Sequence, residues 1–204
     1  MITVYHLRNS RSERIIWLLE ELGIEYAIES FDRDPNFRAP SEMRKIHELG
    51  KSPIVRDGEM LLAESGAIVD YLVTHHGKGR LAPPHADPAW VRYVFWLHFT
   101  EGSLMPWLTM DLLLTSGIVP GVEPGALGPM LAEELARYLR WMDADMAGQP
   151  FAAGNAFGAA DVMLAYALEF ASSRGHLADA KNLNSYLERM TARDAYRRAK
   201  QKAA

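Results

Sequence analysis

The side chains best suited to chemistry stand at one early turn of the chain. Ser10 and Arg11 lie between an expected strand and an expected helix, so a hydroxyl, a cation and the positive end of a helix dipole coincide there. Tyr5, on the same strand, offers a phenol. The chain contains no cysteine, so a thiolate stabilised at this turn has to belong to a substrate. Ser10 could instead cap the helix, because Ser10 and Glu13 have the spacing of a capping box.

A second group of polar residues flanks the strands expected between residues 53 and 63. Ser65 opens a helix, where its hydroxyl and the backbone N–H groups suit a carboxylate, and Glu64 could accept from an ammonium group. Without a ligand, Ser65 would be only an N-cap and Glu64 a first-turn acid. Pro53 begins a strand, where its missing N–H is tolerated. Lys51 is either a partner for a carboxylate or a solvated surface lysine.

These turns depend on a particular order of strands and helices to position them. Residues 1–76 predict the order β-α-β-α-β-β-α, a small α/β sandwich with a four-stranded mixed sheet. The first β-α-β unit is short enough to imply two parallel strands with a right-handed crossover. The strands are expected at residues 2–6, 26–31, 53–56 and 59–63, and the helices at residues 11–22, 41–47 and 65–76.

The composition changes after a linker at residues 77–87, which is rich in glycine and proline. From there to the end no convincing strand occurs. We therefore expect two domains, an α/β domain at residues 1–76 and an all-α domain at residues 88–204. The cations of the last helix are interpreted as a solvated helical end. Helices of the second domain are expected at residues 88–116, 126–147, 159–173, 183–190 and 192–202.

Composition and charge exclude several classes of protein. A chain of 204 residues fits one or two domains, and its net charge of −4 argues against a general nucleic-acid binder. No stretch reaches the ~18 apolar residues of a membrane span, and the N-terminus has no signal-peptide core, so we expect a cytoplasmic protein. Of the seven histidines, His75 and His76 are adjacent and would diverge on a helix, and the other five are scattered. No phosphate-binding loop occurs. We therefore expect neither a metal site nor a bound cofactor.

Four motifs follow one another along the chain, namely Ser10-Arg11, Gly50-Lys51-Ser52-Pro53, Glu64-Ser65 and Phe157-Gly-Ala-Ala-Asp161. In their order and spacing they resemble cytosolic glutathione transferases over nearly the full length of the chain. Three further segments are similar to a fungal and bacterial branch of that family, namely Asn36-Phe-Arg-Ala-Pro, Leu62-Ala-Glu-Ser-Gly and Glu101-Gly-Ser-Leu.

The resemblance implies a thioredoxin-like N-terminal domain followed by an all-helical C-terminal domain. It implies a glutathione S-transferase that activates the glutathione thiol for attack on a small hydrophobic electrophile, as in detoxification, with glutathione peroxidase activity as a further option. Glutathione would be a co-substrate and not a cofactor. The alternative is a catalytically weak relative that carries ligands or binds other proteins, because a fold does not by itself determine a function.

The resemblance also distributes roles among the candidate residues. Glu64 and Ser65 would hold the γ-glutamyl end of glutathione, and Lys51 the glycyl carboxylate. A cis Pro53 would turn the Ser52 backbone toward the cysteinyl backbone of the substrate, which would pair there like an added strand.

The thiol itself needs a hydrogen-bond donor. We favour the Ser10 hydroxyl, with Arg11 adding positive charge, because both stand at the start of the first helix. Tyr5 is the rival, since some branches of the family use a tyrosine at the end of the first strand, and Ser12 comes last.

The helical half would supply the electrophile site and the contacts of a homodimer. The dimer would be formed by the helix near residues 88–116 and the α/β domain of the neighbour. Glu101 would reach the glutathione bound by the other subunit; alternatively, it is an exposed helical acid. Gly158 stands where the family has a serine or threonine, so Asp161 is expected to serve folding. The apolar candidates for the electrophile site are Leu104, Met105, Trp107, Leu108, Met110 and Leu114.

Overall fold

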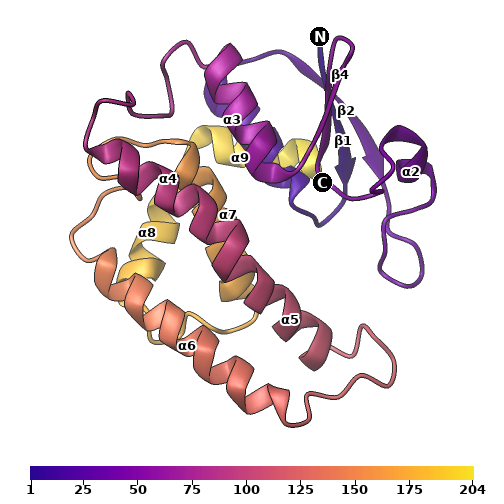
Figure 1. Ribbon diagram of the computed structural model, residues 1–204, viewed down its shortest axis with the longest axis vertical. Helices are drawn as coiled ribbons and strands as arrows, with labels where there is room; N and C mark the ends of the chain where they lie inside the picture. Colours follow the sequence, from indigo (N-terminus) through magenta and orange to yellow (C-terminus); the bar gives the residue numbers. More distant parts are fainter. The chain divides into compact units, whose positions relative to one another are not determined.

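The computed structural model describes residues 1–204, and these divide into two units (Figure 1). The first unit comprises Met1–Ala82 together with Ala192–Ala204, and the second comprises Pro83–Thr191. The boundary expected from composition placed the last helix in the helical half, whereas its contacts place it in the first unit. Composition reports that a segment is helical, but it does not report which core the helix packs against.

A four-stranded mixed sheet forms the centre of the first unit, as the sequence predicted. Strand β1 (Ile2–Leu7) pairs in parallel with β2 (Tyr26–Phe31) on one side. On its other side β1 pairs antiparallel with β3 (Ile54–Asp57), which continues through a hairpin into β4 (Met60–Ala63). The strand order is therefore β2-β1-β3-β4.

Alternation along β1 sends its side chains to opposite faces of the sheet. On one face Tyr5 and Leu7 pack with Ile54 of β3 and with Met43 of the short helix α2 (Glu42–Ile46). The intervening His6 points to the other face, where its ring contacts α1 (Ser12–Leu22).

Two helices of the first unit pack against each other beside the sheet. Apolar residues of α1 recur at helical spacing and are fully buried, among them Ile15, Ile16 and Leu19, and the helix ends at Gly23 in the left-handed conformation. The partner helix is α3 (Ser65–His76), which begins directly after β4 and buries Ile68, Val69 and Leu72.

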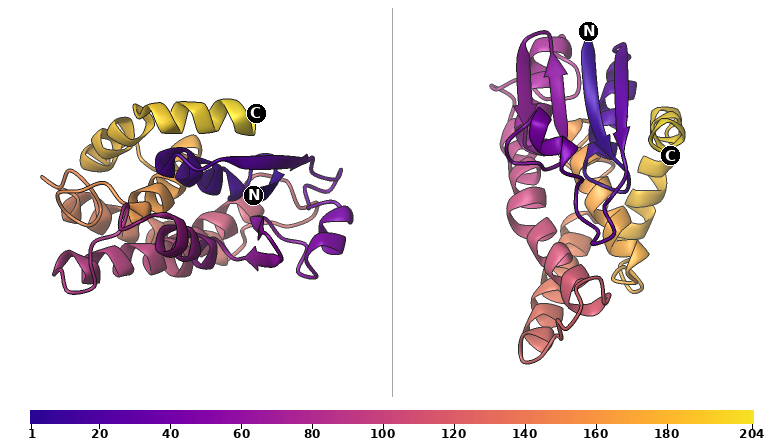
Figure 2. Two further views of the ribbon diagram at one scale, coloured as in Figure 1. Left: turned by 90° about the horizontal axis from the view of Figure 1, so that it is seen from above. Right: turned by 90° about the vertical axis from the view of Figure 1, so that its right-hand side faces the viewer.

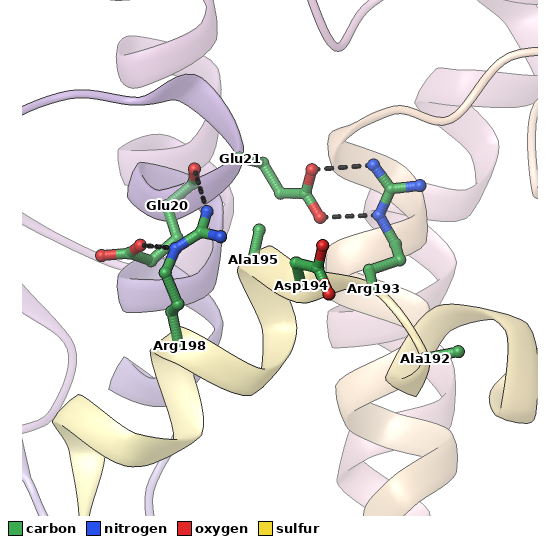
Figure 3. Close-up of a pocket in the computed structure, with 7 residues that line it drawn as sticks. All are labelled: Glu20, Glu21, Ala192, Arg193, Asp194, Ala195 and Arg198. Carbon is green, nitrogen blue, oxygen red and sulfur yellow. Dashed lines mark hydrogen bonds and ion pairs between the residues drawn. The ribbon is translucent and has the colours of Figure 1, made fainter.

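The helix α9 (Asp194–Ala203) lies against α1 through complementary charges, and Figure 2 shows it (yellow) running alongside that helix. Arg193, just before α9, forms an ion pair with Glu21, and Arg198 forms one with Glu20 (Figure 3). Lys200 pairs with Glu13 in the same way. The basic tail is therefore an interface to the acidic side of α1 and not simply a solvated helical end.

The second unit is a bundle of helices. It contains α4 (Ala89–Phe99), α5 (Met105–Thr115), α6 (Leu127–Asp145), α7 (Ala159–Ser173) and α8 (Lys181–Thr191). No helix of either unit is long and apolar enough to cross a membrane.

One wide turn interrupts the long helix that the sequence predicted at residues 88–116. Residues Thr100–Leu104 form a π-helical turn between α4 and α5. Pro106 explains it, because proline has no N–H to donate to the carbonyl of Gly102 and its ring clashes with that carbonyl in a regular helix. The helix therefore continues only after a local widening.

Asp161 is buried at the start of α7 and acts as the folding residue that the sequence predicted. Its carboxylate accepts hydrogen bonds from the backbone N–H of Gly158 at 2.8 Å and of Ala152 at 2.7 Å. It also accepts from the Tyr186 hydroxyl at 2.8 Å, and burial together with this carboxylate raises the pKa of Tyr186 well above its ordinary value. Gly158 contributes only backbone groups to this helix start, so the acid alone supplies the side-chain oxygens.

Candidate active site

Three loops of the first unit meet at one edge of the sheet because of the strand register. Tyr5 of β1 pairs with Ile54 of β3, and Ile54 pairs with Ala63 of β4. β1 and β4 are both antiparallel to β3, so residues 8–11 and 64–65, which follow β1 and β4, reach the same edge as residues 51–53, which precede β3. The predicted residues Ser10, Ser52 and Ser65 therefore come from loops that share one end of the sheet.

Ser10 is joined directly to the loop that precedes β3. Its Oγ lies 2.9 Å from Oγ of Ser52 and 2.9 Å from Oγ of Ser12, and Ser10 is largely buried. The alternative of a capping box with Glu13 is wrong, since the N–H of Glu13 bonds to the Ser10 carbonyl and α1 has no side-chain cap. The Ser10 oxygen instead accepts from the Ser12 N–H at 3.3 Å, so it both tethers the helix start and faces Ser52.

The Ser52–Pro53 peptide bond is cis, which is the geometry that the resemblance implied. Ser52 is half-buried and Pro53 is buried, while Lys51 is exposed. Gly50 has a φ of +55°, and a Cβ there would lie 2.5 Å from Cγ of Arg44. The turn that carries Lys51 and Ser52 is therefore kept close to α2 by the absence of a side chain at residue 50.

Glu64 and Ser65 stand where β4 passes into α3. Ser65 is the first residue of α3 and is buried, and the first N–H groups of a helix have no partner within it. Glu64 is exposed and has a φ of +72°. Non-glycine residues rarely adopt this left-handed conformation, which is typical of functional sites where the surrounding structure enforces it.

Tyr5 lies on the other side of the sheet from Ser10 and Ser12. Its ring lies on the α2 face, and its hydroxyl accepts a hydrogen bond from Nε of Arg56 at 3.0 Å. Arg11 is half-buried at the start of α1, next to Ser10. Of the catalytic candidates, the structure thus brings Ser10 and Arg11 to the loop edge, and it bonds the phenol of Tyr5 to another partner.

Two buried neighbours of Ser10 received little weight in the sequence analysis. Ser12 ranked last among the candidate donors, and His6 counted only as one of several scattered histidines. Both side chains are fully buried, and Nδ1 of His6 lies 2.7 Å from Oγ of Ser12. Strand alternation was the available signal, because it places His6 on the face of the sheet opposite to Tyr5 and Leu7.

The candidates in the second unit occupy the π-helical turn and the helix that follows it. Glu101 is half-buried in the turn, Leu104 is fully buried at its end, and Trp107 is half-buried on α5. Met105 and Leu108 are core residues, whereas Met110 is exposed and Leu114 half-buried. Most of this apolar stripe thus belongs to the core, and Trp107, Met110 and Leu114 present accessible apolar surface.

Comparison with known proteins agrees with this architecture. The model of the glutathione S-transferase N-terminal domain matches residues 1–74, and that of the glutathione S-transferase C-terminal domain matches residues 124–189. Glutathione S-transferase 3 of Schizosaccharomyces pombe is 36% identical, over 99% of this chain and 88% of its own length. Glutathione S-transferase 1 of Saccharomyces cerevisiae is 32% identical, over 100% of this chain and 95% of its own length.

Solved structures show the same likeness. A glutathione S-transferase from Actinobacillus pleuropneumoniae superposes with a TM-score of 0.89 and 30% identity, covering 100% of this chain and 93% of that protein. A sphingomonad glutathione S-transferase in complex with glutathione has the same fold, with a TM-score of 0.81 at 23% identity, over 98% of both chains. The chain belongs to the glutathione S-transferase family, and its function is that of a glutathione transferase.

Proposed function

We propose that the loop edge of the first unit binds glutathione and that Ser10 stabilises its thiolate for attack on a small hydrophobic electrophile. Ser65 and Glu64 hold the γ-glutamyl carboxylate and ammonium, the Ser52 backbone pairs with the cysteinyl residue, and Lys51 faces the glycyl carboxylate. The 2.9 Å contact between Ser10 and Ser52 carries this proposal, because it puts a buried hydroxyl beside the segment that would align the substrate cysteine.

The energy needed for this step is within reach of one hydrogen bond. A free thiol has a pKa of about 8.5, and lowering it by about two units requires roughly 2.7 kcal/mol of preferential stabilisation of the thiolate. A hydrogen bond to a charged group contributes about 1.5–3 kcal/mol. The N-terminus of α1 and the positive charge of Arg11 add to this in the same direction.

The rest of the reaction site is proposed to come from the helical unit and from a second copy of the chain. Leu104 and Trp107 stand at the segment that would border the electrophile, and Glu101 would face the glutathione of the other subunit. Exposed apolar side chains on α4 and α6, namely Val91, Phe95 and Trp141, favour such a homodimer. A cytoplasmic location is part of the proposal, because glutathione keeps thiols reduced there.

Calorimetric titration with reduced glutathione tests the binding site. Ser65→Ala should weaken binding by about 1–3 kcal/mol, because the γ-glutamyl carboxylate then lacks one donor. Ser172→Ala, which changes an exposed serine at the end of α7, is the matched control and should bind like the parent protein. Equal affinity of the Ser65 variant and the parent would place the glutathione site elsewhere.

A parallel assay separates the enzyme from a ligand carrier. Conjugation of chlorodinitrobenzene and reduction of an organic hydroperoxide are measured at saturating glutathione. If the parent protein turns over either substrate and Ser10→Ala turns it over more slowly, thiol activation at Ser10 is supported. Tight glutathione binding without turnover of either would favour the carrier function instead.

A further inference from the structure

A continuous chain of hydrogen bonds runs inward from the loop edge to the C-terminal helix of the first unit. Ser52 and Ser10 are 2.9 Å apart, Ser10 and Ser12 are 2.9 Å apart, and Ser12 lies 2.7 Å from Nδ1 of His6. Nε2 of His6 lies 3.0 Å from the carbonyl oxygen of Ala203 in α9. His6 and Ser12 are fully buried, so the inner part of this chain is shielded from bulk water, while Ser52 at its outer end is half-buried.

The far end of this chain determines which atom donates in each bond. A carbonyl oxygen only accepts, so Nε2 of His6 must carry a proton toward Ala203. Burial lowers the pKa of His6 below its ordinary 6.5, so near neutral pH the ring is neutral and Nδ1 is an acceptor. Ser12 therefore donates to Nδ1 at 2.7 Å, in preference to the Leu7 carbonyl at 3.4 Å.

The donor in each of the remaining hydrogen bonds follows from this, because each hydroxyl has only one proton to donate. The proton of Ser12 is used on His6, so the bond between Ser10 and Ser12 is donated by Ser10. The bond between Ser52 and Ser10 is donated by Ser52 for the same reason. The Ser10 proton consequently points away from the loop edge. Oγ of Ser10 accepts from Ser52 and, at 3.3 Å, from the Ser12 N–H, so an incoming thiol donates to Ser10 in place of one of these two donors.

We propose that Ser10, Ser12 and His6 form a relay that takes up the proton of the glutathione thiol, with His6 as its final acceptor; this rests on the glutathione site proposed above. The S–H bond breaks and leaves its electron pair on sulfur, while the proton bonds to Oγ of Ser10. The original Ser10 proton moves to Oγ of Ser12, and the Ser12 proton moves to Nδ1 of His6. The products are a thiolate and an imidazolium, and Ser10 now donates a hydrogen bond to the thiolate.

His6 and Ser12 are positioning residues in this scheme, because neither touches the substrate and both act through Ser10. Two charged groups act on the imidazole, and a third is bonded to one of them. Glu13 of α1 favours the imidazolium, Arg8 after β1 disfavours it, and Lys200 of α9 bonds to Glu13 at 2.8 Å. The thiolate supplies the additional negative charge that holds the proton on His6. Once the sulfur is alkylated that charge is gone and burial favours neutral His6 again. The proton then returns through Ser12 and Ser10 to solvent at the loop edge.

The first experiment determines which nitrogen of His6 carries the proton when no ligand is bound. Nitrogen-15 NMR of histidine-labelled protein should show His6 neutral at pH 7, protonated at Nε2 and not at Nδ1. In Ser12→Ala the Nδ1 shift of His6 should change, because its donor is removed, while exposed His98 on α4 should stay as it was. An Nδ1-protonated tautomer in the parent protein would overturn the proposal.

The second experiment counts protons when glutathione binds in weak buffer near pH 7.5. Thiolate is measured by near-ultraviolet absorbance, and released protons by an indicator dye. The relay predicts well under one proton released per thiolate formed, with His6 becoming doubly protonated in the NMR spectrum. S-methylglutathione, which has no thiol proton, should bind and leave His6 neutral. Release of one proton per thiolate, or a His6 that stays neutral with glutathione bound, would overturn the relay.

His6→Asn supplies the variant control, because an amide side chain keeps a polar group but takes up no proton. In this variant, one proton should be released for each thiolate that still forms, and the pKa of the bound thiol should rise. Ser12→Ala, which interrupts the relay at its middle, should behave alike. A proton count unchanged from the parent in both variants would count against the relay. If no glutathione binds while His6 shows the derived tautomer, the proposed function fails and the hydrogen-bond direction still stands.

Discussion

At the scale of single residues, position on the sheet separates the two candidate donors. Ser10 lies at the loop edge and contacts Ser52, whereas the Tyr5 hydroxyl lies across the sheet and bonds to Arg56. A phenol is intrinsically the better donor, yet here it has a partner on the other face. The thiol pKa should therefore depend on the alcohol and not on the phenol.

Substitution of Ser10 tests this directly. Ser10→Ala should raise the pKa of enzyme-bound glutathione by at least about one unit, which corresponds to ~1.4 kcal/mol. The pKa is measured by near-ultraviolet absorbance of the thiolate against pH, and affinity at low pH should be nearly unchanged. Tyr5→Phe should have a small effect.

Two further variants control for the start of α1, where the Ser12 N–H bonds to the Ser10 oxygen. Ser10→Gly and Ser10→Asn both leave a tolerable helix start and remove the hydroxyl. A rise in thiol pKa shared by all three variants assigns the effect to the hydroxyl. A rise seen in Tyr5→Phe and absent from the Ser10 variants would instead move the role to Tyr5.

Asp161 provides the second test at residue scale. It is buried and accepts from Gly158, Ala152 and Tyr186, so Asp161→Asn turns an amide toward donors. The free energy of unfolding should fall by about 3 kcal/mol or more, because hydrogen bonds to a charged group contribute about 1.5–3 kcal/mol each. Tyr186→Phe removes only one of them and should cost about half as much or less. Comparable losses in urea unfolding of the two variants would contradict this assignment.

At the scale of elements, α9 is tied to α1 by buried acids and partly exposed cations. The Glu20 side chain is only 8% exposed and accepts from Tyr26, Arg198 and Lys202. Burial alone would raise the pKa of Glu20, but these hydrogen bonds outweigh it and lower the pKa to about 2. Because Ala203 of α9 also bonds to His6, the same charges help hold the relay in place.

This arrangement predicts a specific dependence of stability on pH. The folded-state pKa of Glu20 lies below its ordinary 4.5, so its contribution is complete above about pH 4.5 and is lost as the pH falls toward about 2. The urea midpoint of the parent protein should therefore drop through this window. Glu20→Gln should show a lower midpoint at pH 7 and a flatter dependence below pH 4.5, whereas Glu133→Gln, exposed on α6, should follow the parent. Parallel curves for the parent and Glu20→Gln would remove Glu20 as the cause.

At the scale of the whole molecule, the proposed homodimer rests on exposed apolar surface of the helical unit. Val91 is 74% exposed, and Phe95 and Trp141 are 42% exposed each. The rings of Phe95 and Trp141 lie 5.7 Å apart, so α4 and α6 share one aromatic surface. Aromatic residues are enriched in protein interfaces, and two-fold dimers are the commonest oligomers.

Sedimentation at micromolar concentration should therefore give a mass near twice the 22.9 kDa of the chain. Phe95→Ser with Trp141→Ser should shift the equilibrium toward monomer. Leu127→Ser is the control, since it removes a side chain that is 55% exposed at the other end of α6. A parent protein that sediments at 22.9 kDa would rule out the dimer.

Local patterns in the sequence were sufficient for much of the fold and for the list of site residues. The β-branched and aromatic residues at 2–6, the helical spacing after Arg11 and the Asp57-Gly58 turn predict strands and helices of the sheet domain. Each of these signals depends on neighbours within a few residues. The placement of Ser52-Pro53 and Glu64-Ser65 at strand and helix starts follows from the same local rules.

Tertiary structure decided what depends on residues distant in the sequence. Composition could not assign α9 to the sheet unit, because that follows from its pairing with acids of α1 about 180 positions away. The separation of Tyr5 from Ser10, and the link from Ser10 through Ser12 and His6 to α9, likewise arise only when β1, α1 and α9 pack together. A hydroxyl can be recognised as a candidate from its neighbours in sequence, but the direction of its proton depends on which acceptors the folded chain places around it.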